Sequence, residues 1–185
     1  MPEIVYLSLG SNIDNRELYL KKALASISAY PDTELINISP VYETEPVGIT
    51  DEGTVKEFLN MCCALKTSLD PFYLLELIQR TERALGRRKT KNNTMKMYPG
   101  RSYHSRVIDI DILMFGDRII YTKDLIVPHP ALHERRFVLE PLCDIAASAI
   151  HPLLQLTIKT LKLTHKDEYT VTRFKPEIKF EKKSN

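Results

Sequence analysis

The order in which strand-like and helix-like segments follow one another most constrains the fold of this chain. Residues 4–9 alternate and are rich in strand-forming side chains, and apolar residues recur at helical spacing through 15–29. A second helix begins at Asp70, an N-cap residue followed by proline, and Gly86 is the expected stop. Gly10 to Asn12 are expected to end the first strand. Three further strand-like segments lie at 34–43, 58–66 and 107–115.

This β-α-β-β-α-β order predicts an α+β fold, a ferredoxin-like sandwich with an antiparallel sheet and helices packed on one face. Extra elements follow towards the C-terminus: a hairpin turn at Gly116 leading into residues 119–121, and a short helix near 132–142. We expect one domain over residues 1–165. Residues 166–185 form a charged C-terminal extension that we expect to be partly disordered.

The composition narrows the class of protein. The chain has 185 residues, of which 43% are hydrophobic and 27% charged. A chain of this length can bury a proper hydrophobic core. A net charge of +2 does not indicate nucleic-acid binding. The apolar runs are too short to cross a membrane, and no secretory signal is visible. The three cysteines are therefore expected to be reduced, with the adjacent Cys62 and Cys63 packing on opposite sides of a strand. We expect a cytoplasmic protein.

Two aspartates interrupt the apolar strand "VIDIDILMF". Alternate residues of a strand share a face, so Asp109 and Asp111 point one way and the neighbouring isoleucines the other. At a Cα spacing of about 6.6 Å, two such charges repel by about 2.5 kcal/mol at an effective dielectric of 20. Paired metal ions would offset that repulsion, and Mg²⁺ suits carboxylates combined with phosphates. The alternative is a strand whose acids simply face water.

A long basic segment precedes this strand. Between Gly86 and Val107 there are seven cations and no acid: Arg87, Arg88, Lys89, Lys91, Lys96, Arg101 and Arg106. Loops of this length are often lids or binding loops, and a cationic one beside two carboxylates suits a magnesium-bound polyphosphate. Arg87 and Arg106 are the stronger candidates because they are tied to the helix end and the strand start. The phosphate-binding Gly-x-x-x-x-Gly-Lys motif is absent from the sequence.

Six ordered blocks resemble the 6-hydroxymethyl-7,8-dihydropterin pyrophosphokinase family of folate biosynthesis, over residues 4–152. They are "LSLGSN", "VYETEPVG", "FLN", "LLELIQRTERALGR", "RVIDIDILMFG" and "VPHPALHERRFVLEPL". The resemblance implies transfer of pyrophosphate from ATP, the co-substrate, to the pterin hydroxymethyl group, with release of AMP. It further implies two Mg²⁺ ions and a monomer, with no nucleic-acid or membrane partner.

The resemblance also implies roles for individual residues. Asp109 and Asp111 would be the metal ligands, and together with Arg87 and Arg106 the catalytic group. The ATP site would comprise Gln79, Glu82, Arg87, Arg106, Ile112, His129 and Arg135. The pterin would stack between Phe58 and Phe137, with Asn60 reading its polar edge and Thr44, Glu45 and Val47 completing the pocket. The family's tryptophan segment is absent here, and either Tyr98 or Tyr103 is a candidate replacement for its ring.

Two other functions compete with this interpretation. A nucleotidyltransferase also combines a Gly-Ser turn with an Asp-x-Asp strand, but Gly10 lies about a hundred residues ahead of Asp109, whereas that motif needs them close. A ferredoxin-like binding module without chemistry would not need two carboxylates aimed together. Formation of AMP separates the pyrophosphokinase from both.

Overall fold

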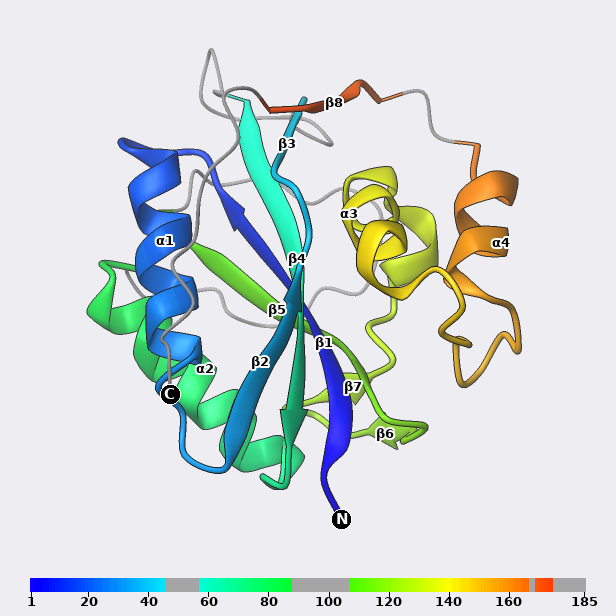
Figure 1. Cartoon of the computed structure of the whole chain (residues 1–185), viewed down its shortest axis with the longest axis horizontal. Helices are drawn as coiled ribbons and strands as arrows, with labels where there is room; N and C mark the ends of the chain where they lie inside the picture. The colour runs from blue at the N-terminus through cyan, green and yellow to red at the C-terminus, as the bar shows by residue number, and fades with distance from the viewer. Residues whose placement is uncertain (46–56, 88–106, 167–168, 175–185) are drawn as a thin grey trace.

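The structure, a computed structural model, describes residues 1–45, 57–87, 107–166 and 169–174 (Figure 1). The strands are β1 (Glu3–Ser11), β2 (Thr33–Ile38), β3 (Tyr42–Thr44), β4 (Phe58–Thr67), β5 (Asp109–Phe115), β6 (Ile120–Tyr121), β7 (Ile126–Val127) and β8 (Val171–Arg173). The helices are α1 (Arg16–Ile27), α2 (Pro71–Ala84), the 3₁₀ turn η1 (Leu132–Glu134), α3 (Arg136–Ala146) and α4 (Ile158–Thr164). No described helix is both long and apolar enough to cross a membrane.

An antiparallel sheet in the order β5-β1-β4-β3-β8 forms the centre of the molecule. The long strand β4 also pairs with β2, so that β2 and β3 lie end to end along one side of it. The predicted strand 34–43 is thus divided. Ser39 still donates its N–H to the carbonyl of Cys62, but Pro40 has no N–H to donate and interrupts the pairing before Tyr42. The α+β class with an antiparallel sheet is confirmed.

Helices cover both faces of this sheet. Helices α1 and α2 lie against one face, and α3 with α4 against the other (Figure 1). Each layer has its own apolar core, and β4 contributes to both: Cys63 packs towards α1 and α2, and Cys62 towards α3. The predicted opposite orientation of the two cysteines is confirmed. The two helices of the predicted sandwich, α1 and α2, therefore share one face as expected, and the C-terminal helices α3 and α4 add a layer on the other.

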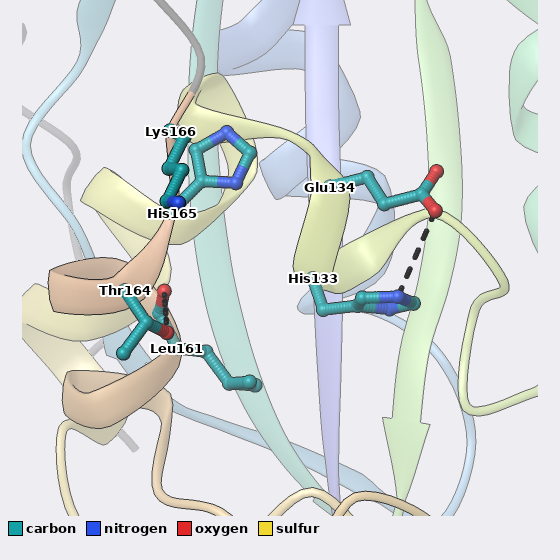
Figure 2. Close-up of a pocket in the computed structure, with 6 residues that line it drawn as sticks. All are labelled: His133, Glu134, Leu161, Thr164, His165 and Lys166. Atoms are coloured by element: carbon teal, nitrogen blue, oxygen red, sulfur yellow. Dashed lines mark hydrogen bonds and ion pairs between the residues drawn. The ribbon is translucent and has the colours of Figure 1, made fainter.

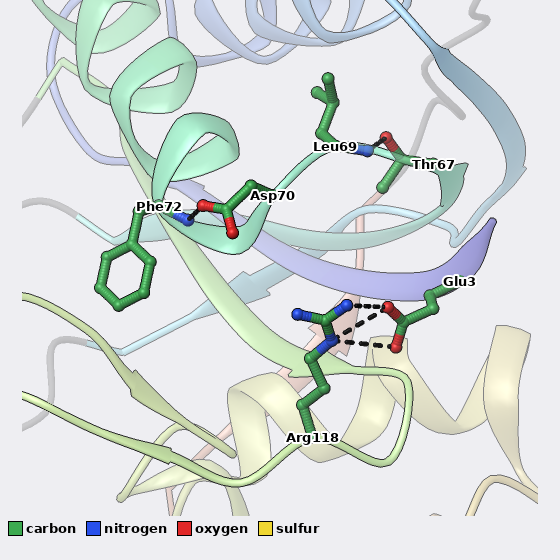
Figure 3. Close-up of polar contacts among 6 residues, drawn as sticks. All are labelled: Glu3, Thr67, Leu69, Asp70, Phe72 and Arg118. Atoms are coloured by element: carbon green, nitrogen blue, oxygen red, sulfur yellow. Dashed lines mark hydrogen bonds and ion pairs between the residues drawn. The ribbon is translucent and has the colours of Figure 1, made fainter. Parts of the chain in front are cut away.

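Local capping explains where the two long helices begin. The Asn15 side chain accepts the backbone N–H of Leu18, which starts α1. Asp70 accepts the N–H of Phe72 (Figure 3), and Pro71 follows at the first helical position. Both helix starts are local signals, and both predictions are confirmed to within one residue.

The predicted turn at Gly116 and the strand after it, β6, are present, but β6 does not pair with β5 as the predicted hairpin requires. Gly116 does turn with a positive φ of 51°, but its N–H donates back to the carbonyl of Ile4. Arg118 then reaches Glu3 at the start of β1, with Nη2 2.5 Å from Oε1 (Figure 3). These contacts tie the turn to β1, and β6 pairs with β7 in a separate two-stranded sheet.

The C-terminal part of the chain holds elements that the sequence did not indicate. The helix expected near residues 132–142 is η1 followed by α3, and α4 comes after it. Strand β8, which lies inside the segment set apart as a charged extension, pairs with β3 at the edge of the main sheet. Phe174 after it packs against the core beneath α1 and α2.

Candidate functional site

The two aspartates share one face of β5. Asp109 lies opposite Gly10 of β1 and Asp111 opposite Ser8, and both are half-buried. The side chains of Ile108, Ile110 and Ile112 are buried in the core beneath α1 and α2. The predicted alternation is therefore confirmed, and the carboxylates face the α3 side of the sheet.

Arg87 stands beside these carboxylates because of how α2 ends. Gly86 adopts a φ of 102°, and the N–H of Arg87 returns to the carbonyl of Glu82 at 2.9 Å. This turn sends the Arg87 side chain to the edge of β5, where Nη1 lies 2.9 Å from Asp109 Oδ1. The same guanidinium pairs with the Glu82 carboxylate.

Glu82 is built into the edge of the sheet. Its side chain is buried, and Oε1 accepts the N–H of Ile110 at 2.9 Å. Burial raises the pKa of Glu82 to about 7, and the positive charge of Arg87 opposes that rise. The structure thus shows a structural role for Glu82, which was predicted as an ATP residue: it holds both β5 and Arg87 in place.

The predicted pterin residues of β3 and β4 lie on the same face as the aspartates. Asn60 and Thr44 are both buried, and the Asn60 amide donates from Nδ2 to Thr44 Oγ1 at 2.7 Å. Phe58, which is half-buried, lies directly opposite Thr44 in the β3–β4 pairing. An aromatic ring and an oriented amide therefore stand two strands away from the carboxylates.

Gly10 links these two groups, although the sequence predicts it to end the first strand. Strand β1 continues through Gly10 to Ser11 rather than stopping there. In the register of the sheet, Gly10 lies between Asn60 of β4 and Asp109 of β5. A glycine inside a strand pattern often marks a close approach of another group, and that signal could have identified it.

A third group of predicted residues lies around the start of α3. The Arg135 guanidinium stacks over the Phe137 ring, 5.6 Å from its centroid. His129 Nδ1 accepts the N–H of Ala131 at 3.2 Å, which leaves the proton of the neutral ring on Nε2. Predicted ATP and pterin residues thus adjoin each other at this point.

Arg16 is a functional candidate that the sequence analysis missed. Its guanidinium pairs with Glu43 at 2.8 Å and donates to the carbonyl of Glu57 at 2.8 Å. Glu43 belongs to β3, and Glu57 immediately precedes β4. Arg16 therefore connects the Glu43 side chain of β3, next to Thr44, to the backbone just before β4.

Other predicted residues lie apart from this face or outside the described residues. Gln79 is exposed on α2, Ile112 is buried in the core, and Glu45 is exposed after β3. Arg106 and Val47 fall outside the residues that the structure describes, as do the two tyrosines considered for the missing ring.

A pocket of about 400 Å³ lies elsewhere, between η1 and the end of α4 (Figure 2). His133 and Glu134 line one side, and Thr164, His165 and Lys166 the other, with Leu161 below. None of these residues is among the predicted site residues.

The donor set of the aspartate face fits a magnesium ion. Asp109 and Asp111 offer hard carboxylate oxygens, and the described residues include no cluster of three or more metal-ligating side chains. Magnesium commonly takes one or two carboxylates and completes its shell with water and substrate phosphates. A pair of carboxylates is compatible with this mode of magnesium binding.

Comparison with known proteins gives a consistent result. A family model described as 7,8-dihydro-6-hydroxymethylpterin-pyrophosphokinase matches residues 6–147. A Bacillus subtilis 2-amino-4-hydroxy-6-hydroxymethyldihydropteridine pyrophosphokinase is 43% identical over 145 residues, covering 78% of this chain and 79% of that protein. The Aquifex aeolicus protein of the same name is 39% identical over 158 residues, covering 85% and 89%.

The fold also has solved counterparts. The structure of Plasmodium falciparum HPPK-DHPS wild type with STZ-DHP matches with a TM-score of 0.66 at 21% identity. The match covers 88% of this chain and 43% of that longer chain. At this identity the likeness concerns the fold alone.

Proposed function

The chain belongs to the 7,8-dihydro-6-hydroxymethylpterin pyrophosphokinase family, and we propose from this that its aspartate face is the active site. The function is transfer of pyrophosphate from ATP to the hydroxymethyl group of the pterin, in folate biosynthesis. The two alternatives, a nucleotidyltransferase and a non-catalytic binding module, are not favoured. A cytoplasmic location and a monomeric state remain predictions from the sequence.

One observation carries the assignment of the site. Asn60, Gly10 and Asp109 form a row across β4, β1 and β5 on one face of the sheet. Two strand spacings separate the ends of this row by about 10 Å. A bicyclic heterocycle held at Asn60 would therefore present its substituent towards the carboxylates.

On the nucleotide side, Asp109 and Asp111 would hold two Mg²⁺ ions together with the phosphates of ATP. When bound, these ions would offset the charge of the phosphates and lower the pKa of the pterin hydroxyl. Arg87 already stands 2.9 Å from Asp109, so its remaining N–H groups can donate to phosphate oxygens. Arg106, His129 and Arg135 would supply further donors, with Gln79, Glu82 and Ile112 completing the ATP site.

On the pterin side, the oriented amide of Asn60 would bind the polar edge of the heterocycle. Phe58 and Phe137 would stack on its two faces. Backbone groups around Thr44, Glu45 and Val47 would complete the pocket. Both aromatic rings are half-buried, which leaves part of each surface available to a ligand.

The chemistry follows from bringing these two sides together. The hydroxymethyl oxygen would attack the β-phosphorus of ATP and lose its proton to solvent. The bond from the β-phosphorus to the oxygen that bridges it to the α-phosphate would break, so that AMP leaves. Positioning of the two substrates and stabilisation of charge would supply most of the acceleration. Arg87 has its guanidinium fixed by Glu82 before substrate arrives, so little reorganisation is needed at the moment of reaction.

Separate Asp109→Asn and Asp111→Asn variants test this proposal. Each removes one negative charge while keeping the size of the side chain, and we expect kcat/KM to fall about a hundred- to a thousandfold. AMP formation from ATP, Mg²⁺ and the hydroxymethyl pterin is the measurement, and thermal unfolding should stay close to that of the wild type. Asp117→Asn, an exposed aspartate just after β5, is the matched control and should keep full activity. Full magnesium-dependent turnover in either site variant would refute the assignment.

A further inference from the structure

Gly10 has no role in the reaction proposed above, yet it lies in the middle of the site. It is buried within β1, between the amide of Asn60 and the carboxylate of Asp109 in the register of the sheet. Its φ lies outside the left-handed region, so the backbone itself would accept any residue. A reason for glycine must therefore come from its surroundings.

The space that a side chain would need is occupied by one group. A Cβ added to Gly10 would lie 2.7 Å from Oδ1 of Asn60, too close for a carbon and an oxygen that are not bonded. Among the described residues outside its chain neighbours, the only other atom within 4 Å is Cγ of the same amide, at 3.9 Å. Glycine is thus required by Asn60 and by nothing else that the structure describes.

The Asn60 amide is fixed from its other end as well. Nδ2 donates to Thr44 Oγ1 at 2.7 Å, and Asn60 and Thr44 are only 4% and 3% exposed as whole residues. With Nδ2 held over β3, Oδ1 lies over Gly10, on the side of the site that holds Asp109. An amide oxygen in that place can accept hydrogen bonds from the N–H groups of a heterocycle.

We propose that Gly10 is a positioning residue: by having no side chain, it lets the Asn60 carbonyl lie over β1, where it accepts from the N–H edge of the pterin. This inference rests on the proposed role of Asn60 in binding the pterin. Any side chain at position 10 would push Oδ1 away or break the Nδ2–Thr44 hydrogen bond. The affinity for the pterin would therefore decrease, whereas the affinity for ATP would not change.

Four proteins test the inference: wild type, Gly10→Ala, Asn60→Ala and the double variant, each assayed with varied pterin at saturating ATP and Mg²⁺. We expect Gly10→Ala to raise the KM for pterin about tenfold, the scale of one lost hydrogen bond, with a smaller change in kcat. Binding of a non-hydrolysable ATP analogue should be unchanged. In the double variant the added methyl has no amide to displace, so its KM should equal that of Asn60→Ala.

The other kinetic outcomes would overturn the inference, and a folding failure of Gly10→Ala is judged by the double variant. If Asn60→Ala raises KM but Gly10→Ala does not, or if the two effects multiply, Gly10 does not act through Asn60. If Asn60→Ala keeps the wild-type KM, the proposed role of Asn60 is wrong and the inference falls with it. If Gly10→Ala does not fold, the double variant should fold because the clash is gone. Failure of both to fold would make Gly10 a purely structural residue.

Discussion

Glu82 connects the end of α2 to the aspartate face. Its carboxylate accepts the N–H of Ile110, between the two aspartates, and pairs with Arg87, which in turn contacts Asp109. Among the strands that the structure describes, β5 lies at the edge of the main sheet, where backbone N–H groups on its outer side have no strand to pair with. A buried carboxylate at this edge fixes both the strand and the arginine.

The raised pKa of Glu82 predicts a specific pH dependence of stability. Burial lifts the pKa from its ordinary 4.5 to about 7, so between these values the folded protein retains a proton that the unfolded chain has lost. The contribution of this group to stability is therefore lost as pH rises through that window, by about 1–3 kcal/mol. Glu82→Gln keeps an oxygen for Ile110 but does not titrate.

We therefore expect the difference in unfolding free energy, Glu82→Gln minus wild type, to increase from about pH 4 to about pH 8, across that window. Urea unfolding of both proteins at the two pH values is the measurement. An unchanged difference between the two pH values would show that folding does not raise the pKa of Glu82.

Strand β8 is the last strand in the order of the main sheet and lies beside β3, at the proposed pterin site. Its partner β3 carries Thr44, and the bonds Glu45 N–H to Thr170 and Phe174 N–H to Val41 flank the pairing. In an antiparallel ladder the bonded residues alternate, so Thr172 faces β3 with its N–H, whereas Val171 directs its N–H outwards. The C-terminal strand thus supports the strand that holds the Asn60 partner.

Proline substitutions can distinguish the contribution of Thr172, whose N–H faces β3, from that of Val171, whose N–H faces outwards. Thr172→Pro removes a ladder bond, and we expect it to lower the unfolding free energy by about 1–3 kcal/mol and to raise the KM for pterin severalfold. Val171→Pro is the matched control, because an edge strand tolerates proline where the N–H faces solvent. Kinetics with varied pterin and urea unfolding are the measurements. Equal effects of the two prolines would contradict the role given to β8.

The elements that the sequence could predict are those with local causes. The start of α2 follows from Asp70 and Pro71 alone, and the face of the aspartates from strand alternation. The strand pairing after the turn at Gly116 was misassigned because the direction of the turn depends on Arg118 reaching Glu3, more than a hundred residues away. Likewise the pairing of β8 with β3 depends on contacts distant in sequence, which no local pattern reveals.

At the scale of the whole molecule, β4 divides two separate cores. Successive side chains of β4 point alternately to the layer of α1 and α2 and to the layer of α3 and α4. Cys63 packs in the first layer and Cys62 in the second. Both cysteines are 0% exposed, whereas Cys143 is partly exposed. Burial raises the pKa of Cys63 to about 12 and also raises that of Cys62, so neither forms the reactive thiolate in the folded state.

The rates at which these two thiols are labelled therefore measure how often each of the two layers opens. In a Cys143→Ser variant we expect a maleimide to label Cys62 and Cys63 only through unfolding, at equal rates, because both layers share β4. A ligand that binds only the folded state, at a hundred times its Kd, should slow both about a hundredfold. A non-hydrolysable ATP analogue with Mg²⁺ is the ligand, and mass spectrometry of peptides resolves the two sites. Should Cys62 label faster than Cys63, and respond less to the ligand, the α3–α4 layer opens on its own and the two cores do not unfold as one unit.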